Sequence, residues 1–398
     1  MSLPTAKLGD VAKFIRGITF KPDDVIALHD EEAVACMRTK NVQKILDCSD
    51  LLAVPSSFVR RKDQRLQTGD ILVSSANSWN LVGKCCWVPH LSWPATFGGF
   101  ISALRAGSDK VDQRYLYWWF SSSYVQALVR SYGQKTTNIS NLNIERCLKL
   151  ELPLPSMTEQ RRIAAILDKA DALCAKRREA LAALEDLGQS LFLDTFGNPA
   201  TNPKGWPMRT VGDLLCSASY GTNEKASEDG QFPVLRMNNI TKKGAIDLAD
   251  LKYMNLEAKS KDRYLVQAGD VLFNRTNSAD LVGKTALFRE RTPMAYAGYL
   301  IRLRTNSNND PEYLSAFLNS AYSKKVLRGM CKSIIGMANI NATELQAIII
   351  GQPPLSLQRE FAKHIGKLIM CQEVHKRTLL ALDNLFSSLQ HRAFTGTL

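Results

Sequence analysis

The chain has 398 residues, of which 45% are hydrophobic and 22% are charged, and this ordinary globular composition can supply the cores of two or three domains. No run of about 18 apolar residues is present and the first residues lack an apolar signal core, so we expect a cytoplasmic protein. The nine cysteines form no CxxC pair and the five histidines lack metal-ligand spacing, which favours reduced core thiols over a zinc site. The net charge of +13 is spread through both halves and is typical of a protein that binds a polyanion such as nucleic acid.

The first part of the chain has the pattern of a mixed globular domain. Short β-like runs between turn residues predict strands at Ile71–Ser75, Lys84–Val88 and Phe100–Arg105. The pattern predicts a helix over Asp112–Arg130 and a last strand over Leu148–Leu152. We therefore expect a first domain of both helices and strands over residues 1–155.

A long helix is predicted next, over residues 156–197. Ser156 and Glu159 have capping-box spacing, in which each side chain accepts a hydrogen bond from the other residue's backbone N–H. No proline follows until Pro199, and Gly197 is a typical helix stop. The apolar frame of this helix, at coiled-coil spacing, comprises Ile163, Ile166, Ala170, Leu173, Arg177, Ala180, Leu184, Leu187 and Leu191.

The second half of the chain repeats the first. Gln67–Leu72 matches Gln267–Leu272 at an offset of 200 residues, and Leu81-Val82-Gly83-Lys84 recurs as Leu281-Val282-Gly283-Lys284 at the same offset. Phe100–Arg105 pairs with Tyr299–Arg304. Such a long period indicates a duplicated domain rather than a solenoid repeat. We expect a second domain over residues 198–354 and a second long helix over 355–398.

The second helix carries the same apolar frame, at an offset of 198 residues, and this predicts that the two helices pack as an antiparallel coiled coil between two pseudo-symmetric α+β (mixed α/β) domains. Arg177 and His375 occupy the same frame position, where a polar residue either fixes the register or extends outward to solvent. The second frame comprises Phe361, His364, Leu368, Cys371, His375, Thr378, Leu382, Leu385 and Leu389.

Two short motifs resemble catalytic sites and are better explained by structure. Gly283-Lys284-Thr285 resembles the end of a P-loop, but the required earlier glycine is Ser278, so we interpret the motif as a turn before a strand. Gln352-Pro353-Pro354-Leu355 resembles an adenine methyltransferase motif but lacks its first residue and its aromatic, so we interpret it as a rigid strand-to-helix joint. We predict no catalytic, cofactor-binding or metal-binding residues on this chain.

Basic and amide-rich loops lie at matching places in the two copies. Arginine pairs with guanine edges, asparagine with adenine edges, and lysine mainly with phosphate. Because the loops differ between copies while the residues around them persist, they are candidates for reading two different DNA sequences. The candidate DNA-binding residues are Arg38, Lys40, Asn41, Arg60, Arg61, Lys62, Ser75, Asn77, Lys135, Thr136, Asn138, Arg236, Asn238, Asn239, Lys242, Lys243, Asn274, Arg275, Thr276 and Asn277.

The order of these motifs resembles the specificity subunit of type I restriction-modification systems. The resemblance is carried by the paired Gly-Asp-Ile/Val-Leu and Gly-Lys turns, by Pro233–Ile240, and by the joint Phe196–Pro199 followed by Gly205-Trp206-Pro207. It covers essentially the whole chain, in the order recognition domain, spacer helix, recognition domain, spacer helix.

The resemblance implies that this chain selects the DNA sequence and does not itself catalyse a reaction. Each recognition domain would read one half of an interrupted double-stranded DNA site, and the helices would set the gap. Two modification (methyltransferase) subunits would carry S-adenosylmethionine, and restriction (translocase/nuclease) subunits would use ATP and Mg²⁺, so this chain itself would need no cofactor and no membrane. The alternative is a self-contained DNA methyltransferase, or a fusion-type restriction enzyme, with an unrecognised active site.

Overall fold

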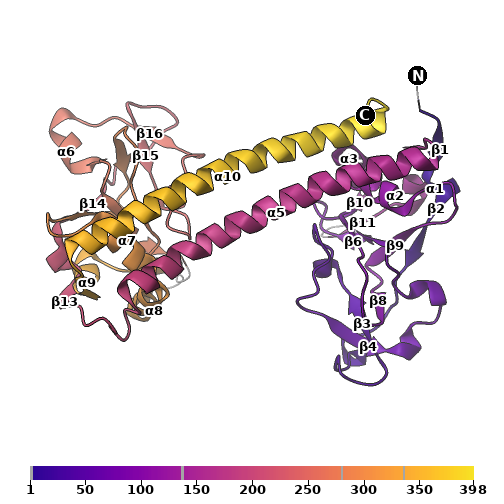
Figure 1. Ribbon diagram of the computed structural model, residues 1–398, viewed down its shortest axis with the longest axis horizontal. Helices are drawn as coiled ribbons and strands as arrows, with labels where there is room; N and C mark the ends of the chain where they lie inside the picture. Colours follow the sequence, from indigo (N-terminus) through magenta and orange to yellow (C-terminus); the bar gives the residue numbers. More distant parts are fainter. Residues whose placement is uncertain (1–2, 136–138, 279–280, 335–336) are drawn as a thin grey trace. The chain divides into compact units, whose positions relative to one another are not determined.

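The computed structural model describes residues 3–135, 139–278, 281–334 and 337–398 (Figure 1). The chain divides into two compact units. Unit 1 comprises Met1–Arg178 and Thr378–Leu398, and unit 2 comprises Glu179–Arg377. These units cut across the four expected segments, because each long helix is divided near its middle. The long helices are α5 (Met157–Phe196) and α10 (Leu355–Thr395).

Unit 1 contains two main sheets. One is antiparallel in the order β2-β9-β5-β7, and the other has the order β4-β3-β8 with β3 and β8 parallel. A small ribbon, β10-β11-β6, extends from the first sheet. The elements are β1 (Thr5–Lys7), α1 (Leu8–Val11), β2 (Ala12–Arg16), β3 (Ala33–Met37), β4 (Leu52–Pro55), β5 (Ile71–Ser74), β6 (Ala76–Asn77), β7 (Cys85–Trp87), β8 (Ala95–Phe97), β9 (Ile101–Ala106), α2 (Gln113–Phe120), α3 (Ser123–Ser131), β10 (Gln134–Lys135), β11 (Ser140–Asn141), α4 (Ile144–Leu148) and β12 (Glu151–Pro153).

Unit 2 repeats this plan. Its main sheets have the orders β14-β22-β18-β20 and β16-β15-β21-β17, and its ribbon is β19-β24-β23. The elements are β13 (Met208–Thr210), β14 (Leu215–Tyr220), β15 (Phe232–Leu235), β16 (Lys252–Met254), α6 (Lys261–Tyr264), β17 (Leu265–Val266), β18 (Val271–Asn274), β19 (Thr276–Asn277), β20 (Thr285–Leu287), β21 (Met294–Tyr296), β22 (Leu300–Thr305), α7 (Pro311–Asn319), α8 (Ala321–Met330), β23 (Lys332–Ile334), β24 (Met337–Asn339), α9 (Ala342–Gln346) and β25 (Ile349–Gly351). The mixed α+β fold and its duplication are thus confirmed.

The helix predicted over Asp112–Arg130 is in fact two helices, α2 and α3. The chain breaks at Ser121 and Ser122, where the Ser122 hydroxyl accepts a hydrogen bond from the Val125 N–H as an N-cap. A serine cap favours a new helix start over helix continuation, because it satisfies an N–H that would otherwise lack a partner. Unit 2 breaks in the same way at Ser320.

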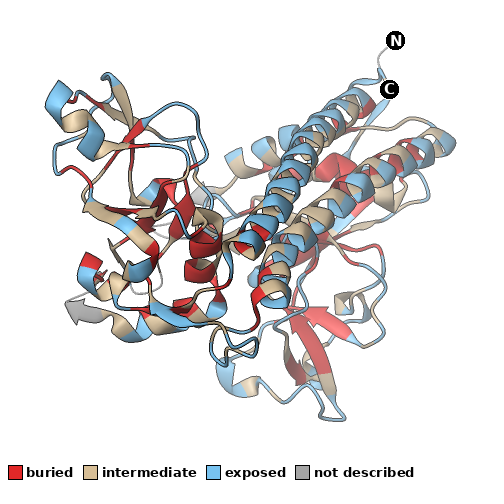
Figure 2. Cartoon of the chain, turned by 60° about the vertical axis from the view of Figure 1, so that its left-hand side comes forward, coloured by how far each residue is buried: buried red, intermediate tan, exposed pale blue. Residues whose placement is uncertain are grey.

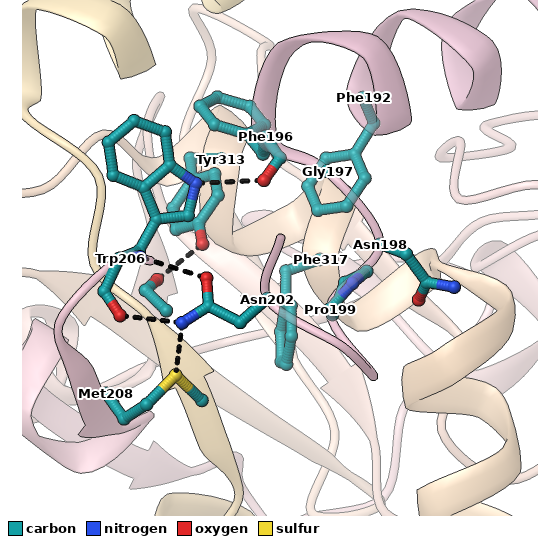
Figure 3. A pocket seen from close by; sticks show the side chains of 11 residues that line it. Phe192, Phe196, Gly197, Asn198, Pro199, Asn202, Trp206, Met208, Tyr313 and Phe317 are labelled. Atoms are coloured by element: carbon teal, nitrogen blue, oxygen red, sulfur yellow. Dashed lines mark hydrogen bonds between the residues drawn. The ribbon is translucent and has the colours of Figure 1, made fainter. Parts of the chain in front are cut away.

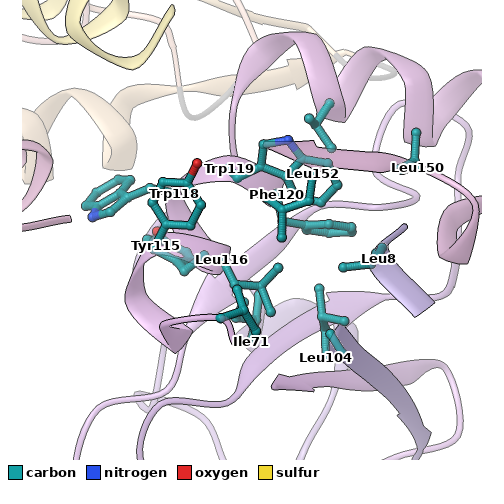
Figure 4. Packing of buried hydrophobic residues seen from close by; sticks show 14 of the residues in the cluster. Leu8, Ile71, Leu104, Tyr115, Leu116, Trp118, Trp119, Phe120, Leu150 and Leu152 are labelled. Atoms are coloured by element: carbon teal, nitrogen blue, oxygen red, sulfur yellow. The ribbon is translucent and has the colours of Figure 1, made fainter. Parts of the chain in front are cut away.

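Helix α2 anchors the core of unit 1. Six consecutive residues, Tyr115–Phe120, are buried, so the helix is covered on all sides rather than on one face. Figure 4 shows Phe120 of this helix between the sheet residues Ile71 and Leu104 on one side and Leu150 and Leu152 on the other. The core therefore joins the sheet, α2 and the strand that leads into the long helix.

A buried glutamine fixes the start of each long helix. Gln160 accepts a hydrogen bond from the Asp112 N–H at 2.8 Å and donates to the carbonyls of Lys110 and Pro155. Gln358 accepts from the Asp310 N–H at 2.8 Å and donates to the Pro353 carbonyl. Because each amide bridges the helix and the cap of the domain helix, it holds one against the other.

An aromatic cluster fixes the end of α5 in unit 2. Phe196 packs against Tyr313 and Phe361, with ring centroids 4.7 and 5.1 Å apart. The Trp206 indole N–H donates to the Phe196 carbonyl at 2.9 Å, which terminates the helix at the joint (Figure 3). In unit 1 the end of α10 is held in the corresponding way, since Phe394 packs on Tyr115 at 5.3 Å.

Within each unit the two long helices pack antiparallel. In unit 1 the end of α10 reaches the domain that precedes the start of α5, because Phe386 packs on Trp118 at 5.4 Å and Gln390 donates to the Trp118 carbonyl. In unit 2, Gln372 of α10 donates to the Leu184 carbonyl of α5 at 3.1 Å. The predicted antiparallel pairing is therefore confirmed within each unit.

Half of the predicted helix frame is displaced by one residue. Leu173, Leu187 and Leu385 are about half exposed, whereas Cys174 is buried and Phe386 is partly buried. Figure 2 shows that exposed and intermediate residues predominate along both long helices. Counted from Ile163, the buried positions of α5 follow at alternating steps of four and three residues, whereas the prediction had steps of three and then four. Either order of steps keeps the contact positions on one face of the helix, so the burial of apolar side chains determines which order is adopted. In α10 the same displacement is seen, because Ile365, Gln372 and Phe386 are half-buried whereas the predicted His364, Cys371 and Leu385 are exposed. Arg177 and His375 are both half-buried.

Candidate nucleic-acid interface

Two candidate segments and the turn after β8 meet at one end of the sheets in unit 1. The Gly98 N–H donates to the Met37 carbonyl at 2.9 Å, which places the turn after β8 beside the turn that begins at Arg38. The Ser75 N–H donates to the Phe100 carbonyl at 2.8 Å, which adds the end of β5. We call the resulting surface the recognition edge: residues 38–41, 75–77 and 98–100 in unit 1.

Unit 2 builds the same edge from residues 236–239, 275–277 and 297–299. The Ala297 N–H donates to the Leu235 carbonyl at 2.9 Å, and the Arg275 N–H donates to the Tyr299 carbonyl at 3.0 Å. The edge is close-packed in both units. A Cβ on Gly17 or Gly221 would lie 2.3 Å from two backbone carbonyl oxygens, so only glycine fits there.

An ion pair with a buried carboxylate anchors the opposite end of the strand that enters the edge. Asp70 binds the Arg105 guanidinium through two contacts of 2.6 Å, and Asp270 binds Arg304 at 2.6 and 3.1 Å. The pairing raises the pKa of Arg304, because the hydrogen bond stabilises its charged form. The repeated Gly-Asp-Ile/Val-Leu motif is thus a scaffold feature that positions β5 and β18.

The first candidate turn uses its asparagines internally. Asn41 is 1% exposed and Asn239 is 2% exposed. The Asn41 Oδ1 accepts from the Arg38 N–H at 2.7 Å and its amide donates to the Asp47 and Asp50 carbonyls, and Asn239 makes the same contacts in unit 2. These two side chains are therefore not available to DNA, and we correct the prediction that included them.

The charged residues of the same turn are partly exposed. Arg38 and Arg236 bind Asp50 and Asp250 at 3.1 and 2.9 Å, and Lys40 also pairs with Asp50. Asn238 is exposed. An arginine held by an exposed carboxylate is oriented but remains partly accessible, so these residues stay candidates.

The second candidate segment is only partly free. The Asn77 and Asn277 side chains accept hydrogen bonds from the next N–H and so close a local turn. The Thr276 hydroxyl donates to Asn339 at 2.9 Å. Ser75 donates to the Ser102 hydroxyl at 2.7 Å, while the Arg275 guanidinium lies 4.8 Å from the centroid of the Tyr220 ring. Arg275 is thus the charged group that this segment presents at the edge.

Asn274 lies behind this segment and is fully buried. Neither side-chain atom has a hydrogen-bond partner among the described residues. A buried amide without partners costs free energy unless a water or another polar group reaches it. Its burial removes it from direct contact with DNA, which corrects its inclusion among the candidates.

The lysines of unit 2 form a basic cluster beside the edge. Lys284 donates to the Met237 carbonyl at 2.7 Å, and Lys324 donates to the Gly283 carbonyl at 2.6 Å. Burial, together with the charge of Lys284, lowers the pKa of Lys324 to about 8. Burial, and then the charge of the exposed Lys242, lower the pKa of Lys284. Lys243 instead pairs with Glu185 of α5. The Gly-Lys motif is therefore a turn, as predicted, with its lysine bound to backbone.

The remaining candidates of unit 1 lie on a flanking loop and on the ribbon. Arg60, Arg61 and Lys62 are exposed, and the Gln64 amide that follows them donates to the Arg16 carbonyl at the end of β2. Lys135 belongs to β10, and the side chain of this residue is not described. Thr136 and Asn138 lie outside the described residues.

The sequence reasoning missed two pairs of equivalent residues. Gln160 and Gln358 hold the long helices, and Phe100 and Tyr299 are large aromatic side chains left exposed at the two edges. Each pair was visible as an aligned position in the repeat. The roles of these residues could not be predicted, because they depend on which backbone carbonyls lie near the glutamines and on whether the folded chain leaves the aromatic rings exposed.

The described part of the chain shows no group of three or more His, Cys, Asp or Glu side chains that could hold a metal ion. Among the same residues, no helix is long and apolar enough to cross a membrane. The arrangement is suited to binding through arginine, lysine and amide groups at two similar edges.

Comparison with known proteins gives a consistent result. The family profile described as the type I restriction modification DNA specificity domain matches residues 4–185 and, again, residues 203–384. The chain is 26% identical to the EcoKI specificity subunit of Escherichia coli K12, over 99% of this chain and 88% of that protein. It is 25% identical to the StySPI specificity subunit of Salmonella potsdam, over 99% and 89% of the two chains.

Solved structures show the same fold. The type I S subunit from M. genitalium aligns with a TM-score of 0.61 and 16% identity, over 99% of this chain and 96% of that one. A chain from a study of complex assembly and conformational transition in a type I R-M system aligns with a TM-score of 0.59 and 15% identity, over 100% and 98%.

Proposed function

The chain belongs to the family of type I restriction modification DNA specificity domains and carries two of them, and from this we propose that it acts as a specificity subunit that binds a two-part DNA site. One observation carries the proposal. The recognition edge is built twice from the same backbone hydrogen bonds, but it carries Ser75 in unit 1 and Arg275 at the equivalent position of unit 2. One scaffold with different side chains is what reading two different half-sites requires.

The half-sites are read, in this proposal, by the outward groups of each edge. Arginine and asparagine side chains contact base edges and the lysines contact phosphate, which also explains the net charge of +13. The chain assembled with its methyltransferase subunits should therefore select an interrupted sequence from a library of random DNA duplexes. Selection of one uninterrupted sequence would contradict the proposal.

The helix pair sets the gap between the half-sites. Removing one heptad from the middle of each helix keeps the seam in register and shortens each helix by about 10 Å, the length of about three base pairs. The preferred gap should become shorter in selections from libraries with variable spacers. An unchanged preferred gap would show that the helices do not act as a ruler.

The partners follow from the same proposal. Two methyltransferase subunits dock on this chain and supply S-adenosylmethionine chemistry, and restriction subunits supply ATP-driven translocation and Mg²⁺-dependent cleavage. The names of the matched E. coli and Salmonella proteins support this assignment, since each is the specificity subunit of a type I restriction enzyme.

One assay distinguishes the proposed specificity subunit from the alternative, a self-contained methyltransferase. The purified full chain is incubated with DNA and labelled S-adenosylmethionine, with and without methyltransferase subunits. We expect label in DNA only when the partner subunits are present. Methyl transfer by the chain alone would establish the alternative.

A further inference from the structure

One aromatic ring in each unit is left in solvent at the middle of the recognition edge. Phe100 is 65% exposed and Tyr299 is 52% exposed, and the two occupy equivalent places in the repeat. Their chain neighbours Ile101 and Leu300 are fully buried. The exposure is therefore specific to this position and is not a property of the whole turn.

The backbone of each aromatic residue is fixed by hydrogen bonds. The Phe100 carbonyl accepts from the Ser75 and Ala76 N–H groups at 2.8 and 3.2 Å, and the Tyr299 carbonyl accepts from the Arg275 N–H at 3.0 Å. The turn itself is closed by the Ile101 N–H, which donates to the Gly98 carbonyl at 2.9 Å. The sheet thus fixes the backbone of each aromatic residue, while more than half of each residue's surface stays exposed.

The surroundings of each ring are polar and basic. In unit 2 the backbone of Tyr299 is bonded to Arg275, and the turn that begins at Arg236 lies beside it through the Ala297–Leu235 hydrogen bond. Single exposed apolar residues are common on protein surfaces and need no partner. Here, however, the same position is aromatic and exposed in both copies, and in both it lies between segments whose residues carry the candidate DNA contacts.

We propose that Phe100 and Tyr299 are specificity-determining residues whose rings pack against a DNA base, one in each half-site. The inference rests on the proposed function and adds an apolar contact to its polar ones. Two kinds of base surface fit an exposed ring that a turn presents: the methyl group of thymine in the major groove, and the face of an unstacked base. The Tyr299 hydroxyl adds a hydrogen-bonding group that Phe100 lacks, so the two rings differ in what they select.

The test uses the full chain assembled with its methyltransferase subunits. Phe100→Ala, Tyr299→Ala and the control Tyr124→Ala are each used to select from random duplex libraries. Tyr124 is a matched control because it is an aromatic residue on α3, outside the edge, and is 71% exposed. Thermal melting of each variant verifies that the fold is retained, as expected for substitutions of exposed side chains.

We expect Phe100→Ala to lower the preference at one position of one half-site by about 10- to 100-fold, the range found for ring–base contacts. Tyr299→Ala should do the same in the other half-site, and Tyr124→Ala should change neither. Replacing thymine by uracil at the affected position distinguishes the two base surfaces. It reproduces the loss if the methyl group is the contact and has no effect if the ring stacks on the base face.

Three results would overturn the inference. They are an unchanged preference in both variants, an equal loss for all sequences, and a change in both half-sites from one substitution. If the unaltered complex selects no interrupted sequence at all, the proposed function itself fails, which separates the two outcomes.

Discussion

Removing Arg304 should strongly destabilise unit 2, because it leaves the buried Asp270 carboxylate without its ion pair. Asp270 is 3% exposed and accepts two hydrogen bonds from Arg304, while the Gln267 N–H supplies one further bond at 2.9 Å. Breaking a buried ion pair from one side costs about 3–5 kcal/mol. For a unit of this size each kcal/mol lowers the Tm by about 2–4 °C, so Arg304→Met should lower the Tm of unit 2 by roughly 6–20 °C.

The assay is a double-mutant cycle followed by urea and thermal unfolding of the full chain. Adding Asp270→Asn to Arg304→Met removes the unpaired charge but keeps an acceptor for the Gln267 N–H. The double variant should therefore recover about 1–2 kcal/mol relative to Arg304→Met alone. Lys259→Met is the control, since Lys259 pairs with Glu257 in solvent and its removal should cost less than about 1 kcal/mol.

The reasoning would be refuted by either of two results. A cost for Arg304→Met no larger than that of Lys259→Met would show that the buried pair does not stabilise the strand. A double variant less stable than Arg304→Met would show that the cost does not arise from the unpaired charge.

Three further predictions concern charge, helix docking and DNA contact. Lys324→Gln installs the residue found at the equivalent position, Gln126, and should reduce the rise of the unfolding free energy with pH between about 8 and 10.5. In that range the folded state of the unaltered chain binds about one proton fewer than the unfolded state, which gives a slope of about 1.4 kcal/mol per pH unit. An unchanged slope in pH-dependent urea titrations would contradict the lowered pKa of Lys324. Gln358→Ala should cost about 1–3 kcal/mol in urea unfolding, because the Asp310 N–H and the Pro353 carbonyl lose their partner; a loss below about 0.5 kcal/mol would exclude a docking role. In DNA selections, Arg275→Ala should relax one half-site, whereas Lys242→Ala should weaken all sequences alike and lower the salt slope by about one; equal loss in both half-sites from Arg275→Ala would contradict one reader per unit.

The large-scale organisation could be predicted from the sequence because it depends on long patterns. The repeat aligns Gly69-Asp70 with Gly269-Asp270, and the positive φ angles of both glycines show why the turn needs that residue. The first long helix, α5, also followed from local signals, since the Ser156 cap lies at its start and the Gly197 stop at its end. Such signals depend only on residues close together in the chain, so they can be recognised without knowing the fold.

The details of the site could not be predicted, because they depend on contacts between distant segments. Asn41 resembles a DNA-reading amide in sequence, but the carbonyls of Asp47 and Asp50 take both of its donors in the fold. Leu173 fits a heptad as well as Cys174 does, and only the packing of the partner helix decides which is buried. Phe100 resembles a core residue of its strand and lies outside because the strand begins one residue later.

The central claim, that each unit reads one half of a two-part site, is tested most directly by a graft within this chain. Asn274→Ser, Arg275→Ser and Thr276→Ala together give unit 2 the sequence Ser-Ser-Ala-Asn that unit 1 has at residues 74–77. The methylated positions in the DNA of a host carrying the chain and its methyltransferase partner are then sequenced before and after the graft. The account predicts an interrupted motif in which only one half changes. A change in both halves, or a motif without a gap, would contradict it.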